Sequence, residues 1–342
     1  MVGNRLPRSS NAENDPGSQG AGDDGGLGVH LRGCWHLSSL PQKGTKVHIP
    51  ASWRSTWCCY QWVDAIAGNQ GGGTVNTELT HERPGATFGV GSLPHRSMSE
   101  ALDFIWTSTD IPTISSLPRL SPAEGMIAQA LVGIEGVSVG QYGGISVDVA
   151  HLDVDQFITT DLHSAAYGSF KEFLDTFQQR NTRNVTSVKW QFVGPVTLGA
   201  ALLRLGLEPE IAFPLALQAV RSHVLALEEE VTRVCGDITQ IIVLDEPSLS
   251  EALEPGYPVG IEYIIDLISG ALAAVEPRNI SGLHCCSRTD WGAILATGAN
   301  IISVPVPNAN NEEDMAEMLV AASRISDHLA HGGHIAWGAV RT

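Results

Sequence analysis

The chain has 342 residues, 43% of them hydrophobic, and its 20 Lys and Arg against 37 Asp and Glu give a formal net charge of −17. This length suits one large domain or two small ones, and the acidic balance excludes nucleic acid as an expected partner because it repels phosphate groups. The sequence has no run of 18 apolar residues and no apolar secretory segment near its start. We therefore expect neither a transmembrane helix nor a membrane partner.

Residues 1–85 differ in composition from the rest of the chain. They hold 7 Lys and Arg and 7 Asp and Glu, whereas residues 86–342 hold 13 and 30 and so carry the whole net charge. Residues 1–29 are rich in Gly, Asn, Asp and Ser, which cannot bury enough apolar surface to fold. Residues 30–70 contain Trp and Cys without a regular period. This stretch is either a small added subdomain, or part of a poorly ordered extension or of a segment upstream of the true start of translation. We predict that residues 1–85 are a disordered or irregular extension and that residues 86–342 form one domain.

The cysteines indicate the redox environment. Because four of the six form two adjacent pairs, they make a poor disulfide framework, and we expect a reducing, cytoplasmic compartment. The six are Cys34, Cys58, Cys59, Cys235, Cys285 and Cys286.

From Thr87 onward, short apolar runs alternate with amphipathic stretches, which is typical of parallel strands joined by crossover helices. Seven or eight such units in this length predict the α/β class and a TIM-type (β/α)8 barrel. An open doubly wound sheet is the alternative, but no Gly-rich dinucleotide loop follows the first strand. The candidate strands are Thr87–Gly91, Pro112–Ser116, Ile145–Val149 as the least clear, Val188–Val193, Gln240–Leu244, Ile280–Leu283, Ile301–Val304 and His334–Ala339.

Three helices are well marked in the sequence, by capping residues or by an apolar face. Ser97 and Glu100 fit a capping box before an apolar run. Residues Glu210–Val234 carry apolar residues along one helical face, and residues Glu312–Ala330 begin with acidic residues and end before two glycines.

The active site of a barrel lies at the C-terminal ends of its strands. His284 and Cys286 follow one strand, and because residues i and i+2 of a strand face the same side, both would converge while Cys285 faces away. An imidazole and a thiolate supply half of a tetrahedral zinc site. The alternative is a small buried cysteine beside a hydrogen-bonded histidine. Further ligands would come from elsewhere; the candidates are Asp245, Glu246, Cys235, His334 and water.

Two carboxylates, Asp245 and Glu246, follow another apolar strand. Such a pair would bind an amine, act as acid or base, or ligate a metal. By alternation only one of them need face the centre. Glu246 alternatively caps a following helix turn or pairs with an arginine. Ser92, in a Gly-Ser-Leu-Pro turn, would hold a carboxylate or simply cap the next helix.

Taken in order, the segments GVGSLP, QFVGPVTL, VLDEPSL and LHCC resemble the catalytic barrel of cobalamin-independent methionine synthase. The chain is most similar to its short, single-barrel actinobacterial type, within the superfamily that includes uroporphyrinogen decarboxylase, and the resemblance covers about residues 86–342. It implies transfer of a methyl group from 5-methyltetrahydrofolate, the co-substrate, to a small thiol, homocysteine, that zinc activates. The same resemblance makes His284 and Cys286 zinc ligands, places Asp245 on the substrate amino group, and places Ser92 near the substrate carboxylate.

The sequence departs from that family at three places. The family's zinc glutamate is replaced by the stretch Ile302-Ser303-Val304-Pro305, no cysteine follows Cys286, and Ser115-Ser116 stands where a second substrate carboxylate is expected. Two alternatives therefore stay open. The first is a member of the superfamily with other chemistry, decarboxylation or corrinoid-dependent methyl transfer. The second is a degenerate barrel that binds a thiol compound or a protein.

Overall fold

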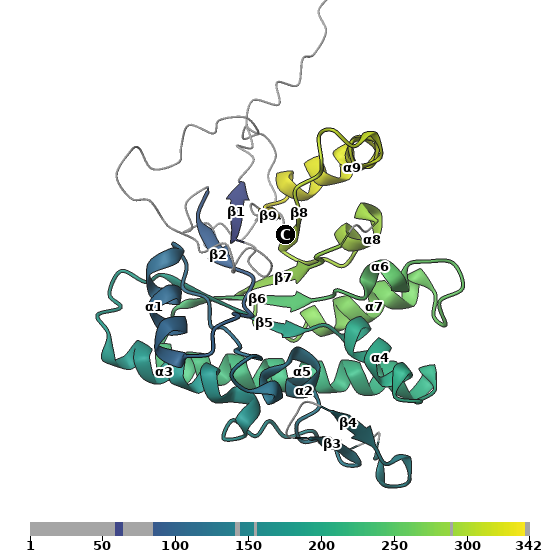
Figure 1. The fold of residues 1–342 in the computed structure, drawn as a ribbon. Helices are drawn as coiled ribbons and strands as arrows, with labels where there is room; N and C mark the ends of the chain where they lie inside the picture. The colour runs from purple at the N-terminus through teal and green to yellow at the C-terminus, as the bar shows by residue number, and fades with distance from the viewer. Residues whose placement is uncertain (1–58, 64–84, 141–143, 154–155, 288–289, 339–342) are drawn as a thin grey trace, which may run out of the picture. The chain divides into compact units, whose positions relative to one another are not determined.

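A computed structural model describes residues 59–63, 85–140, 144–153, 156–287 and 290–338 (Figure 1). The chain divides into two units, residues 1–48 and 49–342, and every described residue belongs to the second. The prediction for residues 1–85 falls almost wholly outside the described residues. Within that range, the described segment Cys59–Val63 is a strand, β1.

Five parallel strands form the centre of the second unit and confirm the α/β class (Figure 1). Each corresponds to a predicted apolar run, and all pair in register with their neighbours. At one end of the sheet, β1 pairs antiparallel with both β9 and β2. The sheet order is β2 (Thr87–Gly89), β1, β9 (His334–Gly338), β8 (Ile301–Pro305), β7 (Ile280–His284), β6 (Thr239–Asp245) and β5 (Ser187–Val193).

Residues Pro112–Ser116, predicted as a strand, make isolated parallel bridges rather than a continuous ladder. The Ile111 N–H donates to the Thr87 carbonyl over 3.0 Å, and the Ile114 N–H donates to the Lys189 carbonyl over 2.8 Å. The segment thus hydrogen-bonds to β2 and to β5, the two end strands of the sheet order.

The prediction of a barrel strand at Ile145–Val149 is wrong. Residues Ile145–Val147 form β4, which pairs antiparallel with β3 (Val137–Val139) in a separate two-stranded sheet. The physical reason is proximity along the chain: a short connection favours a local antiparallel pair, whereas parallel pairing requires a long crossover.

The predicted helices are confirmed with small shifts of their ends. Ser97 caps α1 by accepting from the Glu100 N–H, and α5 and α9 cover the two long predicted stretches. The helices are α1 (Met98–Ser108), α2 (Met126–Ala130), α3 (Gly168–Gln179), α4 (Pro195–Arg204), α5 (Pro209–Cys235), α6 (Leu249–Ala252), α7 (Ile261–Leu272), α8 (Trp291–Ala296) and α9 (Glu312–Ala330), with short 3-10 turns η4 (Pro122–Glu124), η5 (Val149–His151) and η6 (Ala165–Tyr167).

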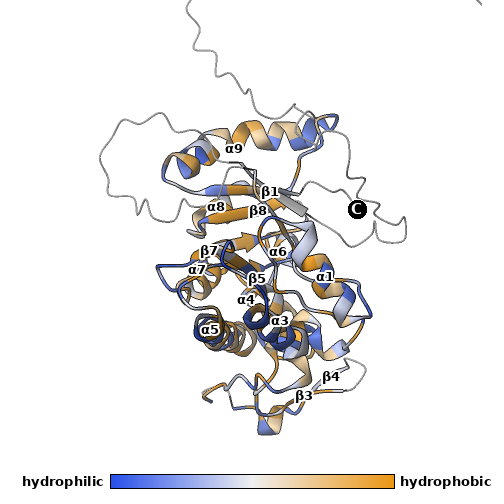
Figure 2. Cartoon of the chain, turned by 90° about the vertical axis from the view of Figure 1, so that its left-hand side faces the viewer, coloured by the Kyte–Doolittle hydropathy of each residue, from blue (hydrophilic) through white to orange (hydrophobic). Residues whose placement is uncertain are grey.

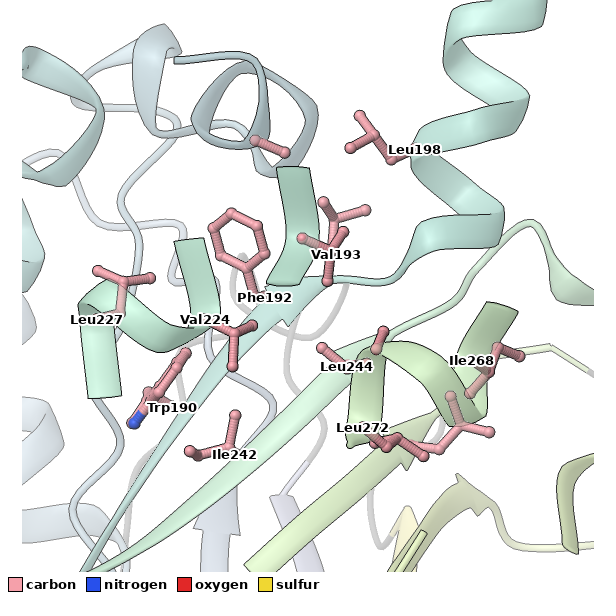
Figure 3. Packing of buried hydrophobic residues seen from close by; sticks show 14 of the residues in the cluster. Trp190, Phe192, Val193, Leu198, Val224, Leu227, Ile242, Leu244, Ile268 and Leu272 are labelled. Atoms are coloured by element: carbon pink, nitrogen blue, oxygen red, sulfur yellow. The ribbon is translucent and has the colours of Figure 1, made fainter. Parts of the chain in front are cut away.

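The main sheet lies between two apolar clusters, because successive side chains of its strands point to opposite faces. On the helix side, Trp190 of β5 and Ile242 of β6 lie in one cluster with Leu227 of α5 and Leu272 of α7 (Figure 3). Hydrophobic colour runs along β7 and β8 in Figure 2. The second, smaller cluster lies on the other face and contains Ala86, Phe88, Ile111, Ile241, Val243, Ile280, Ile301 and Ala336.

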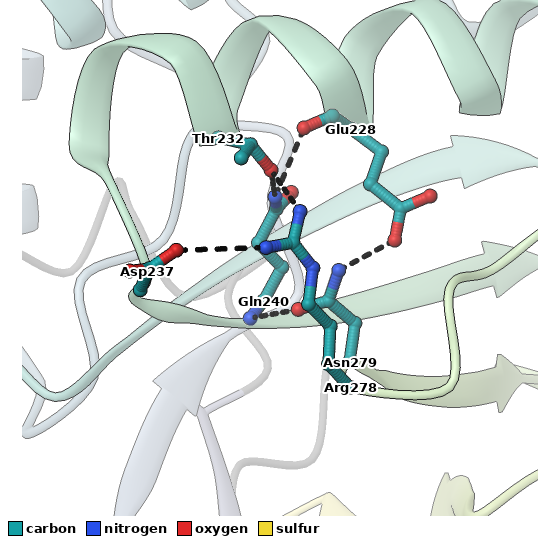
Figure 4. A network of polar contacts seen from close by, with 6 residues as sticks. All are labelled: Glu228, Thr232, Asp237, Gln240, Arg278 and Asn279. Atoms are coloured by element: carbon teal, nitrogen blue, oxygen red, sulfur yellow. Dashed lines mark hydrogen bonds and ion pairs between the residues drawn. The ribbon is translucent and has the colours of Figure 1, made fainter.

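A buried polar network ties α5 to the N-terminal ends of β6 and β7 (Figure 4). The Asn279 side chain accepts from the Gln240 N–H over 2.9 Å and donates to the Glu228 carboxylate over 2.5 Å. The Gln240 amide donates to Thr232 over 2.9 Å. Because these groups satisfy one another, the network fastens the helix to the sheet at the end opposite the predicted site.

Candidate active site

Asp245 and His284 come together, as the strand-end prediction requires. Each is the last residue of its strand, and they are register partners across β6 and β7. His284 is in turn the partner of Ser303 on β8. Register partners in a parallel sheet face the same side, so these three side chains share one face at the C-terminal ends of neighbouring strands.

One oxygen of the buried Asp245 carboxylate makes no hydrogen bond within the described part of the protein. The residue is only 3% exposed, and its Oδ1 atom has no hydrogen-bond partner among the described residues. Burial raises the pKa of the carboxyl above its ordinary value, and the positive charge of Lys189 opposes that rise. Because buried polar atoms are nearly always paired, Oδ1 is the atom of this site most suited to receive a donor from a ligand.

His284 is held as a neutral imidazole. Its Nδ1 atom lies 3.2 Å from the Ser303 carbonyl oxygen and 3.0 Å from the Ser303 hydroxyl. Since the carbonyl only accepts, Nδ1 carries the proton and Nε2 carries the lone pair. Burial, with the charge of Lys189, lowers the pKa of His284 to about 3. A histidine whose Nδ1–H is fixed by a backbone carbonyl has the tautomer and orientation of a metal ligand.

The two cysteines after His284 separate as alternation predicts. Cys285 is buried in the helix-side cluster, and its sulfur lies 3.5 Å from the Ser287 carbonyl oxygen. Cys286 is exposed. The two predicted ligands, His284 and Cys286, would be only two of the three or four protein donors that zinc usually takes. Across the part of the chain that the structure describes, no cluster of three or more His, Cys, Asp and Glu side chains is arranged to hold a metal ion.

Two other candidate ligands, Cys235 and His334, lie away from His284. Cys235 ends α5 just before β6 begins, and His334 is the first residue of β9, so both are at the N-terminal ends of the strands. His328 and His331 of the C-terminal end of α9 contact backbone carbonyls, at 3.3 Å and 2.6 Å. Both contacts are those of structural histidines near a helix C-terminus, and the two residues line a pocket of about 430 Å³ beside α8 and α9.

Glu246 caps a helix. It is completely buried, and its carboxylate accepts from the Val196 N–H over 2.8 Å and from the Thr197 N–H over 2.7 Å, at the start of α4. Burial raises its pKa to about 7, against the effect of these hydrogen bonds. A Cβ at Gly194 would lie 2.2 Å from Glu246 Oε1. The Gly194-Pro195 and Asp245-Glu246-Pro247 motifs therefore lie against each other. Glu246 is a helix cap, but the alternative that it caps a following helix turn is wrong about the helix: its hydrogen bonds go to α4, which precedes it in sequence.

Ser92 lies at the same end of the structure as Asp245, after β2. Its hydroxyl oxygen is 3.1 Å from that of Ser116 and accepts from the Gln191 side-chain amide over 3.3 Å. Gly91 precedes it with φ +137°, and a Cβ there would lie 2.2 Å from Gln191 Oε1. Only glycine combines that backbone conformation with such a close approach.

Lys189 is the polar residue of this region that sequence reasoning missed. It is 2% exposed, and its ammonium donates to the Val90 carbonyl and, over 3.1 Å, to Gln191 Oε1. Burial lowers its pKa, and the Asp245 charge opposes this effect. The signal was present in the strand Ser187–Val193, where Lys189 and Gln191 occupy alternate positions among apolar residues.

A pocket of about 100 Å³ lies beside the ends of β7 and β8. Trp291, Pro305 and Met318 give it apolar walls, and Asp314 and Glu317 add carboxylates. Ser287, one residue after Cys286, lines it as well, so the pocket opens next to the exposed cysteine.

No protein-family model and no curated protein matches the chain. In the described residues, no helix is both long and apolar enough to cross a membrane.

Proposed function

We propose that the protein is a methionine-synthase-like methyltransferase that moves a methyl group from 5-methyltetrahydrofolate, or a related donor, to a small thiol such as homocysteine. The observation that carries the proposal is the pairing of Asp245 with His284. A buried carboxylate oxygen with no partner among the described residues shares one face with a neutral imidazole of fixed tautomer, at the ends of adjacent strands. This pair suits a ligand that presents an amine beside a metal-bound group.

The proposed fold is a closed (β/α)8 barrel. Its support is that residues 111–116 hydrogen-bond to β2 on one side and to β5 on the other, which are the two ends of the sheet order. A second apolar cluster on the face away from the helices, with Ile241, Ile280 and Ile301, has the composition of a barrel interior. In this proposal β1 occupies the eighth position, between β9 and β2, and runs antiparallel there.

Each residue of the proposed site has one role. Asp245 accepts from the substrate amino group, and Ser92 binds the substrate carboxylate. His284 and Cys286 hold zinc, with water and the substrate thiol completing its coordination. When bound, zinc keeps a thiol in the nucleophilic thiolate form near neutral pH. Glu246 contributes by fixing the start of α4 beside Asp245. The two adjacent cysteine pairs, Cys58-Cys59 and Cys285-Cys286, make a poor disulfide framework and suit a reducing cytoplasm.

A second candidate is a metal-free reaction of the same superfamily, such as decarboxylation. The observation that favours it is that, in the described residues, no cluster of three or more His, Cys, Asp and Glu side chains is arranged to hold a metal ion, whereas zinc usually takes three or four protein ligands. The buried Lys189 near Asp245 would then neutralise an anionic substrate.

Metal content measured by mass spectrometry tests the first candidate against the second. We expect about one zinc per chain, lost in the His284→Ala/Cys286→Ser double variant and retained in Cys235→Ser, which removes a thiol at the other end of the strands. Homocysteine-dependent methyl transfer should follow the zinc content. Wild-type protein that takes up no zinc after reconstitution would rule out the metal mechanism and favour the second candidate.

A further inference from the structure

The residues beneath Ser92 form a directed chain of hydrogen bonds. The Lys189 ammonium donates to Gln191 Oε1 over 3.1 Å, Gln191 Nε2 donates to Ser92 Oγ over 3.3 Å, and Ser92 Oγ lies 3.1 Å from Ser116 Oγ. Lys189 and Gln191 come from β5, whereas Ser92 and Ser116 follow other elements. The chain of contacts therefore joins three segments of the fold.

The direction of this chain follows from which groups can donate. An ammonium group has no acceptor, so the end of the Gln191 amide that faces Lys189 is its oxygen. The opposite end is then the NH2 group, which can only donate, and Ser92 Oγ is its acceptor. A second bond, from Lys189 to the Val90 carbonyl, fixes the ammonium and prevents the order from reversing.

Because Ser92 Oγ accepts from Gln191, its own hydroxyl hydrogen is directed elsewhere. It donates to Ser116 Oγ, or to a ligand that replaces this contact. If it donates to Ser116, the Ser116 hydroxyl in turn is free to donate onward. The two hydroxyls are half-buried, and behind them lies a fully buried positive charge. Two donors with a cation behind them favour an anion.

We infer that Lys189 and Gln191 are positioning residues that orient the Ser92 and Ser116 hydroxyls as donors toward a carboxylate of the bound ligand. The inference rests on the proposed function for the identity of that ligand, a small thiol that also carries a carboxylate. It assigns roles to Lys189, Gln191 and Ser116, and it explains why Gly91 lies against the Gln191 side chain.

Calorimetric binding of matched probes tests the inference. L-Homocysteine carries thiol, amine and carboxylate, 3-aminopropane-1-thiol lacks the carboxylate, and 4-mercaptobutyrate lacks the amine. We expect wild-type protein to bind L-homocysteine about tenfold or more tightly than 3-aminopropane-1-thiol, which differs from it by the carboxylate alone; this preference is the effect of one hydrogen bond to a charged group. 4-Mercaptobutyrate reports the amine contact separately. Gln191→Glu still accepts from Lys189 but cannot donate to Ser92, so this preference should disappear. Lys189→Met, which frees the amide to rotate, should reduce it.

Gln178→Glu on the exposed side of α3 makes the same change of charge and should keep the wild-type preference. If the β5 variants do not fold, Ser92→Ala should abolish the preference and Ser92→Thr should restore it. A preference that survives both Gln191→Glu and Ser92→Ala overturns the inference while leaving the proposed function in place. Equal affinity for butyrate and 4-mercaptobutyrate that depends on Gln191 supports the inference and rejects the proposed function, because the thiol then contributes nothing to binding. No binding of any probe overturns both.

Discussion

Glu246 and Asp245 are adjacent, equally buried carboxylates, and the structure predicts opposite consequences for their removal. Glu246 accepts two backbone N–H groups of α4, whereas Asp245 Oδ1 has no partner among the described residues. Truncation of each to alanine deletes a carboxylate from the end of the same strand. The difference between the two variants therefore reports the hydrogen bonds to α4.

The size of the expected loss of stability follows from the backbone N–H groups that lose their acceptor. Glu246→Ala leaves the Val196 and Thr197 N–H groups buried without an acceptor, at about 1–3 kcal/mol each. Loss of the negative charge at the start of α4 adds about 0.3–1 kcal/mol. We expect Glu246→Ala to lower the free energy of unfolding by about 2–7 kcal/mol more than Asp245→Ala does. That is a large share of the roughly 5–15 kcal/mol of a typical domain.

Urea unfolding followed by circular dichroism measures this difference through the shift of the midpoint. The same two proteins are then titrated with homocysteine. Asp245→Ala should stay folded and lose binding, whereas Glu246→Ala should lose stability. Equal stability of the two variants, or a greater loss in Asp245→Ala, would refute the assignment of Glu246 as a helix cap.

Three further outcomes are expected. Gly194→Ala should destabilise the protein by about 1–3 kcal/mol, the usual cost of overpacking, because its Cβ would lie 2.2 Å from Glu246 Oε1; an unchanged urea midpoint would contradict the close packing of these two residues. Leu244→Ala should cost about 2–5 kcal/mol in the same assay, since Leu244 is fully buried, and a cost below about 1 kcal/mol would show that the core between β6 and the helices is loosely packed. Burial lowers the pKa of His223 from 6.5 to about 4. On acidification the unfolded state therefore binds the proton first, and stability should fall as the pH drops from 6.5 toward 4. His223→Gln should reduce this loss, and an identical pH profile in the variant would argue against a buried neutral histidine.

Local patterns in the sequence predicted most of the secondary structure. The apolar runs that became β5 to β9 and the amphipathic stretches that became α5 and α9 are local signals, since each depends on residues within a few turns of one another. The exception is Ile145–Val149, where the same kind of apolar run pairs with β3 instead of joining the main sheet. A short run does not specify its partner, because pairing depends on which segment lies nearest.

The sequence by itself indicated that Asp245 and His284 end strands of a parallel sheet, and the parallel topology then requires their side chains to meet at one edge. The role of Glu246 was decided only by the tertiary structure. Alternation along a strand says that Glu246 faces away from Asp245, but not that the first turn of α4, about 50 residues earlier in the chain, supplies its hydrogen bonds.

The same holds for Lys189, whose contact with Val90 spans 99 residues. The partner of a long flexible side chain depends on which segments pack around it, and residue spacing along the chain does not predict that partner. Strand and helix identity follow from short-range periodicity, which the sequence displays directly. The environment of each polar side chain in the site follows from long-range packing, which exists only once the strands and helices have assembled.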